Sequence, residues 1–170
     1  MILKNRLTIL SVLLTGFLSL NNLEPQTIKH KIETISDFNQ NPYAKFIDSK
    51  FKYKEQEIVG DDFEEHIIYL GDMKLKNMQT IYILTSFKTI QAASVKHGQS
   101  KILILNAEKD LINHYTLDLP EELPYKTSRN ILFFHRYNED HNKIGKIRVK
   151  IEDELPEMIC IGPDGCYNKQ

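Results

Sequence analysis

Two segments near the middle of the chain are apolar at adjacent positions rather than at alternate ones. They are Thr80–Leu84 and Ile102–Leu105. A strand with one face in water alternates apolar and polar residues, so a continuous apolar run of this length predicts a strand covered on both faces. The β-branched and aromatic residues in these runs favour the same conformation. We therefore expect the two segments to form the central strands of the fold.

Other segments alternate apolar and polar residues, which predicts strands with one buried and one solvated face. The clearest is Gly145–Glu152, where Ile147, Val149 and Ile151 fall on one side. The same period in Lys45–Lys54 predicts a strand whose inner positions are Ile47, Ser49, Phe51 and Tyr53. The remaining predicted strands are His66–Leu70, Ile112–Leu119, Asn130–Tyr137 and Met158–Ile161.

Residues 86–97 allow either a short helix that begins at Ser86 or a continuation of the preceding strand. The run of β-formers before Phe87 favours the extended alternative. Turn signals recur about every eight to twelve residues along the whole chain, and no helices alternate with the strands. The pattern predicts an all-β fold, an antiparallel β-sandwich or a barrel-like meander of about seven to nine short strands, with at most one or two short helices.

The N-terminal segment 1–20 has the organisation of an export signal. Lys4 and Arg6 precede Leu7–Leu20, which carries no charge. As a helix this run would span about 21 Å, less than the roughly 30 Å of a hydrocarbon core. Because Phe17 and Leu18 stand where a cleavage site favours small residues, an uncleaved membrane tether is the alternative. We expect an exported protein, periplasmic or secreted, that contacts a membrane only if the signal is not cleaved.

The rest of the chain divides into a leader and one domain. Residues 21–44 form a polar leader, in which Thr27–Phe38 fits either a short helix or an edge strand. Residues 45–170 form a single β-rich domain. Removal of residues 1–20 changes the net charge from −1 to −3, and no block of like charges occurs. A chain with this pattern lacks the basic stripe of a nucleic-acid-binding protein.

The chain contains two cysteines, Cys160 and Cys166, on either side of a Gly-Pro-Asp-Gly turn. The turn brings the two thiols together, so we expect a disulfide in an oxidising compartment. A redox pair or half of a zinc site is the alternative, although neither the spacing nor the neighbouring residues favour one.

A cluster of polar residues joins the two predicted central strands. His97, Gly98 and Ser100 lie there, and residues on loops between rigid strands often bind ligands. His97 and Ser100 are a candidate base and nucleophile, but no G-x-S-x-G sequence and no orienting acid accompany them. The simpler interpretation is a turn in which Gly98 adopts a positive φ and the other two side chains bond to the backbone.

The six histidines do not predict a metal site, because no two are spaced to share one helix face or one strand face. His135 and His141 flank a predicted hairpin loop with two acids between them, which is more typical of a solvated loop than of a chelate. We expect no metal and no cofactor. Three tyrosines near predicted loops are candidates for a binding surface: Tyr125, Tyr137 and Tyr167.

These patterns favour an exported binding or interaction module that engages an envelope protein or a small ligand through its loops. They do not predict nucleic-acid binding. The alternative is a small extracytoplasmic hydrolase or metal-dependent enzyme with a site near His97 and Ser100, to which His66 could contribute.

Overall fold

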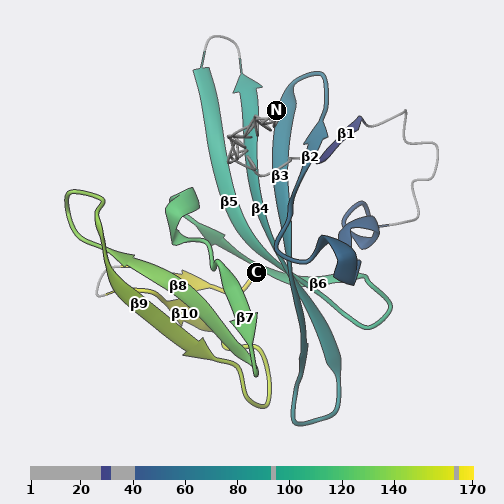
Figure 1. Cartoon of the computed structure of the whole chain (residues 1–170), viewed down its shortest axis with the longest axis vertical. Helices are drawn as coiled ribbons and strands as arrows, with labels where there is room; N and C mark the ends of the chain where they lie inside the picture. The colour runs from purple at the N-terminus through teal and green to yellow at the C-terminus, as the bar shows by residue number, and fades with distance from the viewer. Residues whose placement is uncertain (1–27, 32–40, 93–94, 163–164) are drawn as a thin grey trace, which may run out of the picture.

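The chain folds into an all-β structure, as its pattern predicts. The computed structural model describes residues 28–31, 41–92, 95–162 and 165–170, which form eleven strands in three sheets. The helical elements among these residues are short 3₁₀ turns. The predicted signal and most of the predicted leader lie outside the described residues. Figure 1 shows a long, curved sheet on one side and a smaller group of strands packed against its lower half.

The largest sheet has six strands in sequence order. Each strand pairs antiparallel with its neighbour, except that β1 and β2 run parallel. The order is linear, with β1 and β6 at the edges, so the described strands form an open sheet rather than a closed one. The strands are β1 (Ile28–Lys31), β2 (Glu55–Val59), β3 (Phe63–Lys74), β4 (Thr80–Ala92), β5 (Val95–Leu105) and β6 (Leu111–Leu117).

Two smaller sheets cover one face of this sheet. Between the layers lies the larger core, which includes Ile83, Ile104, Tyr115 and Phe134. The layered arrangement is that of a sandwich, the first of the two predicted alternatives. The covering strands are β7 (Lys126–Ser128), β8 (Ile131–Tyr137) and β9 (Lys143–Lys150) in one sheet, and β10 (Met158–Cys160) and β11 (Cys166–Asn168) in the other.

The second face of the six-stranded sheet carries its own core. Phe46 packs there with Tyr69, Leu84 and Leu103. Adjacent residues of β4 and β5 therefore point into different cores, which explains why both strands are apolar at successive positions. The prediction of two central strands covered on both faces is confirmed, and the favoured extended conformation after Ser86 is confirmed as far as Ala92.

The prediction of a strand at Lys45–Lys54 is wrong. This segment forms the 3₁₀ turns η1 (Ala44–Phe46) and η2 (Ser49–Phe51), and Phe46 is its buried residue. The carboxylate of Asp48 accepts a hydrogen bond from the Lys50 amide at 2.9 Å. Such a local bond to the backbone competes with strand pairing, and alternation alone does not reveal it. The chain then enters β2, a strand that the sequence pattern did not predict.

A bulge in β3 changes which residues of the strand face the larger core. The pairing with β4 shifts between Tyr69 and Gly71, and Gly71 has a φ of 127°, a value that favours glycine. Ile68 before the bulge and Met73 after it therefore face the same side of the sheet. The hydroxyl of Thr127 in β7 donates to the Leu70 carbonyl at 2.8 Å and ties the two layers together at this point.

The other strand predictions agree with the structure within a few residues, apart from one position. The alternation of Ile112–Leu119 predicts that Leu119 is buried, yet it is 43% exposed. The strand ends at Leu117, and Pro120 begins the 3₁₀ turn η3 (Pro120–Glu122), because proline has no amide hydrogen to donate to a sheet.

Candidate metal centre

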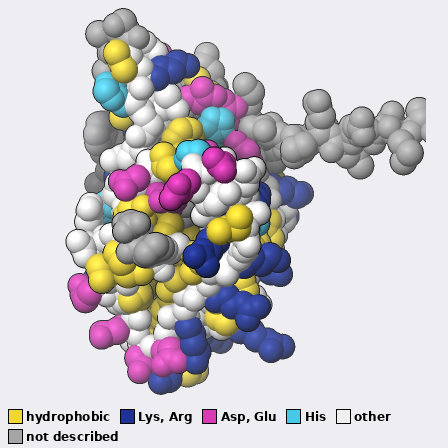
Figure 2. Space-filling view, turned by 90° about the vertical axis from the view of Figure 1, so that its left-hand side faces the viewer, with side chains coloured by type: hydrophobic (Ala, Val, Ile, Leu, Met, Phe, Trp, Pro, Cys, Tyr) yellow, Lys and Arg dark blue, Asp and Glu magenta, His cyan; other side chains and the backbone are white. Residues whose placement is uncertain are grey.

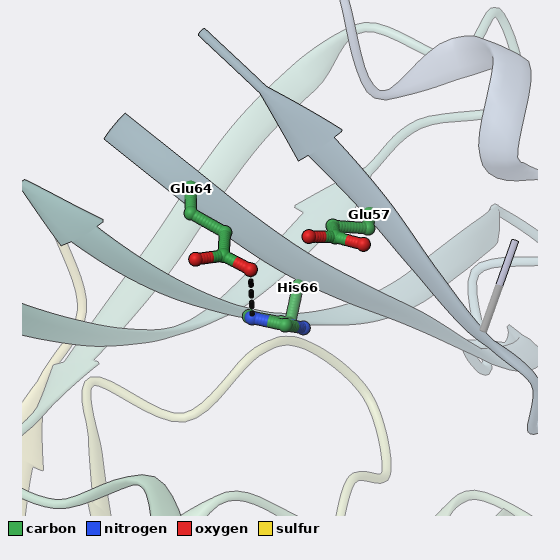
Figure 3. Close-up of side chains that lie close together, drawn as sticks. All are labelled: Glu57, Glu64 and His66. Atoms are coloured by element: carbon green, nitrogen blue, oxygen red, sulfur yellow. Dashed lines mark ion pairs between the residues drawn. The ribbon is translucent and has the colours of Figure 1, made fainter. Parts of the chain in front are cut away.

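The hairpin formed by β2 and β3 brings acidic residues beside a histidine. Glu57 lies directly opposite His66, and Val59 lies opposite Glu64. Since side chains alternate along a strand, Glu55 and Glu57 of β2 share one sheet face with Glu64 and His66 of β3. This is the face that carries the larger core further along the sheet. Figure 3 shows Glu57, Glu64 and His66 projecting from the two strands into the same small region.

Each of these three residues offers one ligand atom, and the three atoms lie within 4.8 Å of one another. His66 Nε2 is 3.5 Å from Glu64 Oε1. On the other side of the ring, His66 Nδ1 is 2.5 Å from Glu55 Oε1. A proton on Nδ1 donates to the Glu55 carboxylate and leaves the lone pair of Nε2 free to bind a metal.

The cluster combines one buried carboxylate with two partly exposed ones. Glu57 is only 2% exposed, whereas Glu55, Glu64 and His66 are partly exposed. The ion pairs that Glu55 and Glu64 make within the described residues are with His66. Two carboxylates thus lie beside the imidazole ring, and Glu57 occupies the register position between His66 of β3 and Lys29 of β1.

A small pocket adjoins the cluster and gives it access to solvent. Its volume is about 290 Å³, and Glu55 and His66 form one of its walls. The Phe87 ring lies roughly parallel to His66, with the ring centroids 6.5 Å apart. The other lining residues are Ile68, Thr85 and Leu123. A ligand bound beside His66 would therefore contact water on one side and apolar side chains on the other.

The structure does not bring His97 and Ser100 together. Both lie within β5, so the prediction of a loop at this point is wrong. They are three positions apart, and alternation places them on opposite faces of the strand. His97 is exposed, whereas Ser100 is 1% exposed and its hydroxyl has no hydrogen-bond partner among the described residues. The two cannot act as base and nucleophile in this arrangement.

Gly98 also differs from its predicted role. The described glycine with a positive φ is Gly71, so Gly98 is not in the turn conformation that was expected. Its lack of a side chain instead makes room for a ring, because a Cβ at this position would lie 3.0 Å from the Phe87 ring. Gly98 and Ser100 thus lie on the face of the metal cluster, next to a residue that lines its pocket.

A larger pocket of about 660 Å³ lies between η3, the β8–β9 hairpin and the β10–β11 hairpin. His135, Tyr137 and His141 line it, together with Glu139 and Asp140 from the hairpin loop. The described residues hold no metal-ligating group that includes His135 or His141. His135 instead stacks on Tyr125, with a centroid distance of 4.1 Å and an interplanar angle of 14°.

The predicted disulfide is present. Cys160 and Cys166 are paired across the β10–β11 hairpin, and their sulfur atoms are 2.12 Å apart. Within the residues that the structure describes, no helix has the length and apolar character needed to cross a membrane. Both observations are compatible with an exported protein.

The residues of the candidate centre were not expected from the sequence, except for His66 in a secondary role. The reason is that Glu55–Val59 was not predicted to be a strand. The turn at Gly60–Asp62 is the feature of the sequence that indicates the centre, because a hairpin closed there pairs Glu57 with His66. A search for histidine pairs overlooks a centre built from one histidine and carboxylates of the neighbouring strand.

Comparison with models of protein families, with curated proteins and with solved structures gives no match to this chain. Any function must therefore be inferred from the geometry described above.

Proposed function

We propose that this protein is an exported binding module that holds a divalent transition-metal ion of the zinc type at Glu57, Glu64 and His66. The observation that supports the proposal is the convergence of one imidazole and two carboxylates within 4.8 Å, on the paired strands β2 and β3. A rigid hairpin holds such ligands more accurately than a loop does. The disulfide and the N-terminal pattern of the sequence support the exported location.

The mixture of donor atoms favours zinc over magnesium or calcium. Mg²⁺ and Ca²⁺ take oxygen ligands, whereas imidazole nitrogen suits Zn²⁺ and its neighbours in the transition series. In a tetrahedral site with bonds of roughly 2.0–2.1 Å, two ligand atoms are about 3.3 Å apart. The 3.5 Å between His66 Nε2 and Glu64 Oε1 is already close to this value. The three ligand atoms lie within 4.8 Å of one another, so Glu57 would have to move closer to complete a three-residue site.

Two neighbours complete the environment of the proposed ion. Glu55 accepts the Nδ1 proton of His66, which fixes the orientation of the ring and makes Nε2 a better ligand. The adjoining pocket is lined by Glu55 and His66 and not by Glu57 or Glu64, so a small molecule bound there would contact the imidazole ring from the side of Glu55. Three protein ligands with one open position are typical of sites that exchange a ligand.

Calorimetric titration of the purified, metal-free protein with Zn²⁺ tests the proposal. We expect one ion per chain. His66→Ala should abolish this binding and Glu64→Gln should weaken it, whereas Glu55→Gln should reduce affinity by about 10–100-fold through the loss of ring orientation. His97→Ala and Asp62→Asn are matched controls, because His97 is on the opposite face and Asp62 is in the exposed turn of the same hairpin. Undiminished Zn²⁺ binding by His66→Ala would contradict the proposal, as would equal competition by Mg²⁺.

A further inference from the structure

The sheet formed by β7, β8 and β9 has an outer face that faces away from the core. Leu132 and Phe134 of β8 point inward and are fully buried. Alternation therefore places the intervening side chains of the strand on the outer face. They are half-buried rather than covered, and they are Ile131, Phe133, His135 and Tyr137.

Most of these outer residues form a continuous row of rings. Tyr125 stacks on His135 and also lies beside Phe133, with a centroid distance of 6.5 Å for the second pair. Tyr137 meets His135 edge-on at 6.2 Å. Four half-buried rings thus lie along β8, and within this row Tyr125 and His135 cover one face of each other.

Every outer residue of β8 lies opposite a cation of β9. The pairs are Ile131 with Lys150, Phe133 with Arg148, His135 with Lys146 and Tyr137 with Lys143. On the other side, Lys126 of β7 lies opposite Phe133. The Arg148 guanidinium is 5.9 Å from the centre of the Phe133 ring. A row of rings is therefore bordered by basic side chains on both neighbouring strands.

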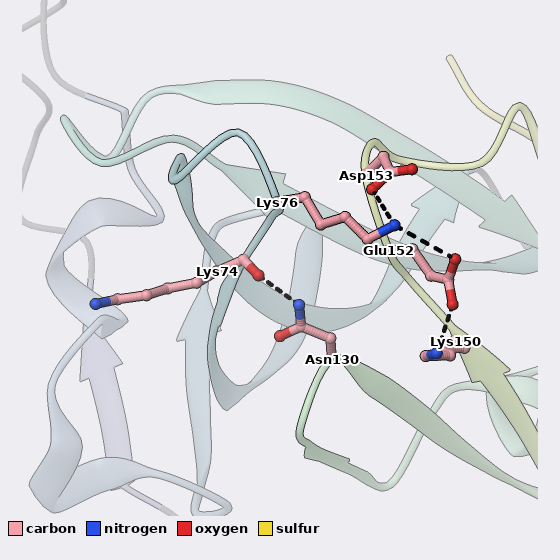
Figure 4. Close-up of polar contacts among 6 residues, drawn as sticks. All are labelled: Lys74, Lys76, Asn130, Lys150, Glu152 and Asp153. Carbon is pink, nitrogen blue, oxygen red and sulfur yellow. Dashed lines mark hydrogen bonds and ion pairs between the residues drawn. The ribbon is translucent and has the colours of Figure 1, made fainter.

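One of these cations is already neutralised. The Lys150 ammonium pairs with the Glu152 carboxylate (Figure 4). The second oxygen of this carboxylate is 3.9 Å from Lys76 Nζ. Lys76 Nζ is in turn 2.7 Å from Asp153 Oδ1. Asn130 in the β7–β8 turn donates to the Lys74 carbonyl nearby, so this end of the face is bound to the larger sheet.

The other four cations make no ion pair within the described residues: Lys126, Lys143, Lys146 and Arg148. Burial, together with Lys143 and Lys146, lowers the pKa of His135. Figure 2, seen from the side of the β8–β9 hairpin, shows Lys and Arg side chains gathered at the lower right, and histidines with Asp and Glu side chains beside them in the upper half. Positive charge without a described ion pair therefore lies along β9, whereas the pocket beside His135 and Tyr137 is also lined by acids: Glu121, Glu122, Glu139 and Asp140.

Protection of an edge strand explains only part of this arrangement. Lysines on an edge such as β9 discourage pairing with other chains. They do not account for the half-exposed rings on the neighbouring strand β8. A combination of flat apolar surface and unpaired cations is expected where a ligand with both flat faces and negative charges binds.

We propose that this outer face binds an acidic polysaccharide chain laid along β8. The apolar faces of the sugar rings would pack on Tyr125, His135 and Tyr137, and carboxylate or sulfate groups would pair with the cations of β9. Successive outer residues of a strand are about 6.8 Å apart, so the three unpaired cations of β9 reach along roughly 14 Å of an extended polymer. The disulfide indicates an oxidising compartment, where polysaccharides rather than nucleic acids are the common polyanions. This surface is independent of the proposed metal centre.

The test uses polygalacturonate as the acidic polymer and dextran of similar size as the neutral one. Binding is measured by calorimetry at low and high salt, with a chelator present so that no metal can bridge the carboxylates. We expect binding to polygalacturonate that weakens with salt, and no binding to dextran. The variant Lys146→Ala/Arg148→Ala should lower affinity about tenfold, since it removes two exposed charge contacts. Lys54→Ala/Lys96→Ala is the matched control, because these exposed lysines lie outside β7, β8 and β9.

Tyr137→Ala tests the contribution of the rings without a change of charge, and it should weaken binding even at high salt. Circular dichroism confirms that each variant is folded. Lack of binding to polygalacturonate would overturn the proposal, and so would equal loss of affinity in the control variant. Equal or tighter binding of a thymidine oligonucleotide would also overturn it and would assign the surface to single-stranded nucleic acid.

Discussion

Replacement of Phe46 by alanine should be among the most destabilising single changes in this protein. Phe46 lies in the 3₁₀ turn η1 and is 0% exposed. It covers the second face of the six-stranded sheet, where it packs with Ile67, Tyr69 and Leu84. Deletion of a fully buried phenylalanine side chain costs about 3–5 kcal/mol through lost transfer free energy and the cavity that remains. In a domain of this size, that loss lowers the melting temperature by roughly 6–20 °C.

Phe51→Ala provides the control, because the same residue type lies five positions further along in η2, which buries no residue. We expect it to change the free energy of unfolding by about 1 kcal/mol or less. Urea denaturation followed by circular dichroism, with the disulfide intact, gives both values. The alternation in Lys45–Lys54 predicts the opposite, since a strand there would bury Phe51. A larger loss for Phe51→Ala than for Phe46→Ala would therefore refute the packing described here.

Three further predictions follow from other parts of the chain. A thiol reagent should add no label to the unfolded, non-reduced protein and two labels after reduction. Labelling without reduction would contradict the disulfide. Replacement of both cysteines should lower the free energy of unfolding by about 2 kcal/mol, because the closed loop is short. The mass of the exported protein should lack roughly the first twenty residues, whereas a full-length mass in the membrane fraction would indicate a tether. Burial raises the pKa of Tyr69 to about 12 and those of Tyr43, Tyr115 and Tyr167 still further. The protonated phenol of Tyr69 thus contributes stability below pH 10 that is lost between pH 10 and about 12. Phenolate absorbance should show delayed ionisation in the folded protein compared with the unfolded chain.

The candidate metal centre illustrates how little of a site a linear pattern reveals when the ligands lie on different strands. His66 and Glu64 are two residues apart, a spacing that places both on one face of a strand. Glu57 joins them only through the register of β2 against β3, and Glu55, two positions away on β2, orients the imidazole ring. The spacing of residues within one strand is visible in a sequence, whereas the alignment between strands depends on the turn that connects them.

His97 and Ser100 are, by contrast, a pair that the sequence suggested and the structure does not form. Their proximity in the sequence suggested a pair, but strand alternation separates residues three positions apart. Had this segment been a loop, the two side chains could have met. The length of β4 and β5 excludes a loop at this point, because the pairing of these strands continues well beyond their apolar parts.

The sequence by itself determined the all-β class, the two central strands and the cysteine pair. Each depends on local chemistry: side-chain alternation, runs of β-branched residues, and a turn that brings two thiols together. Tertiary structure decided the rest. Whether Lys45–Lys54 pairs as a strand or coils over the sheet depends on the cavity that Phe46 fills. The outer face of β8 acquires its border of cations only because β9 pairs with it in one register. Such choices rest on contacts between distant segments, whose free energy does not appear in any local pattern.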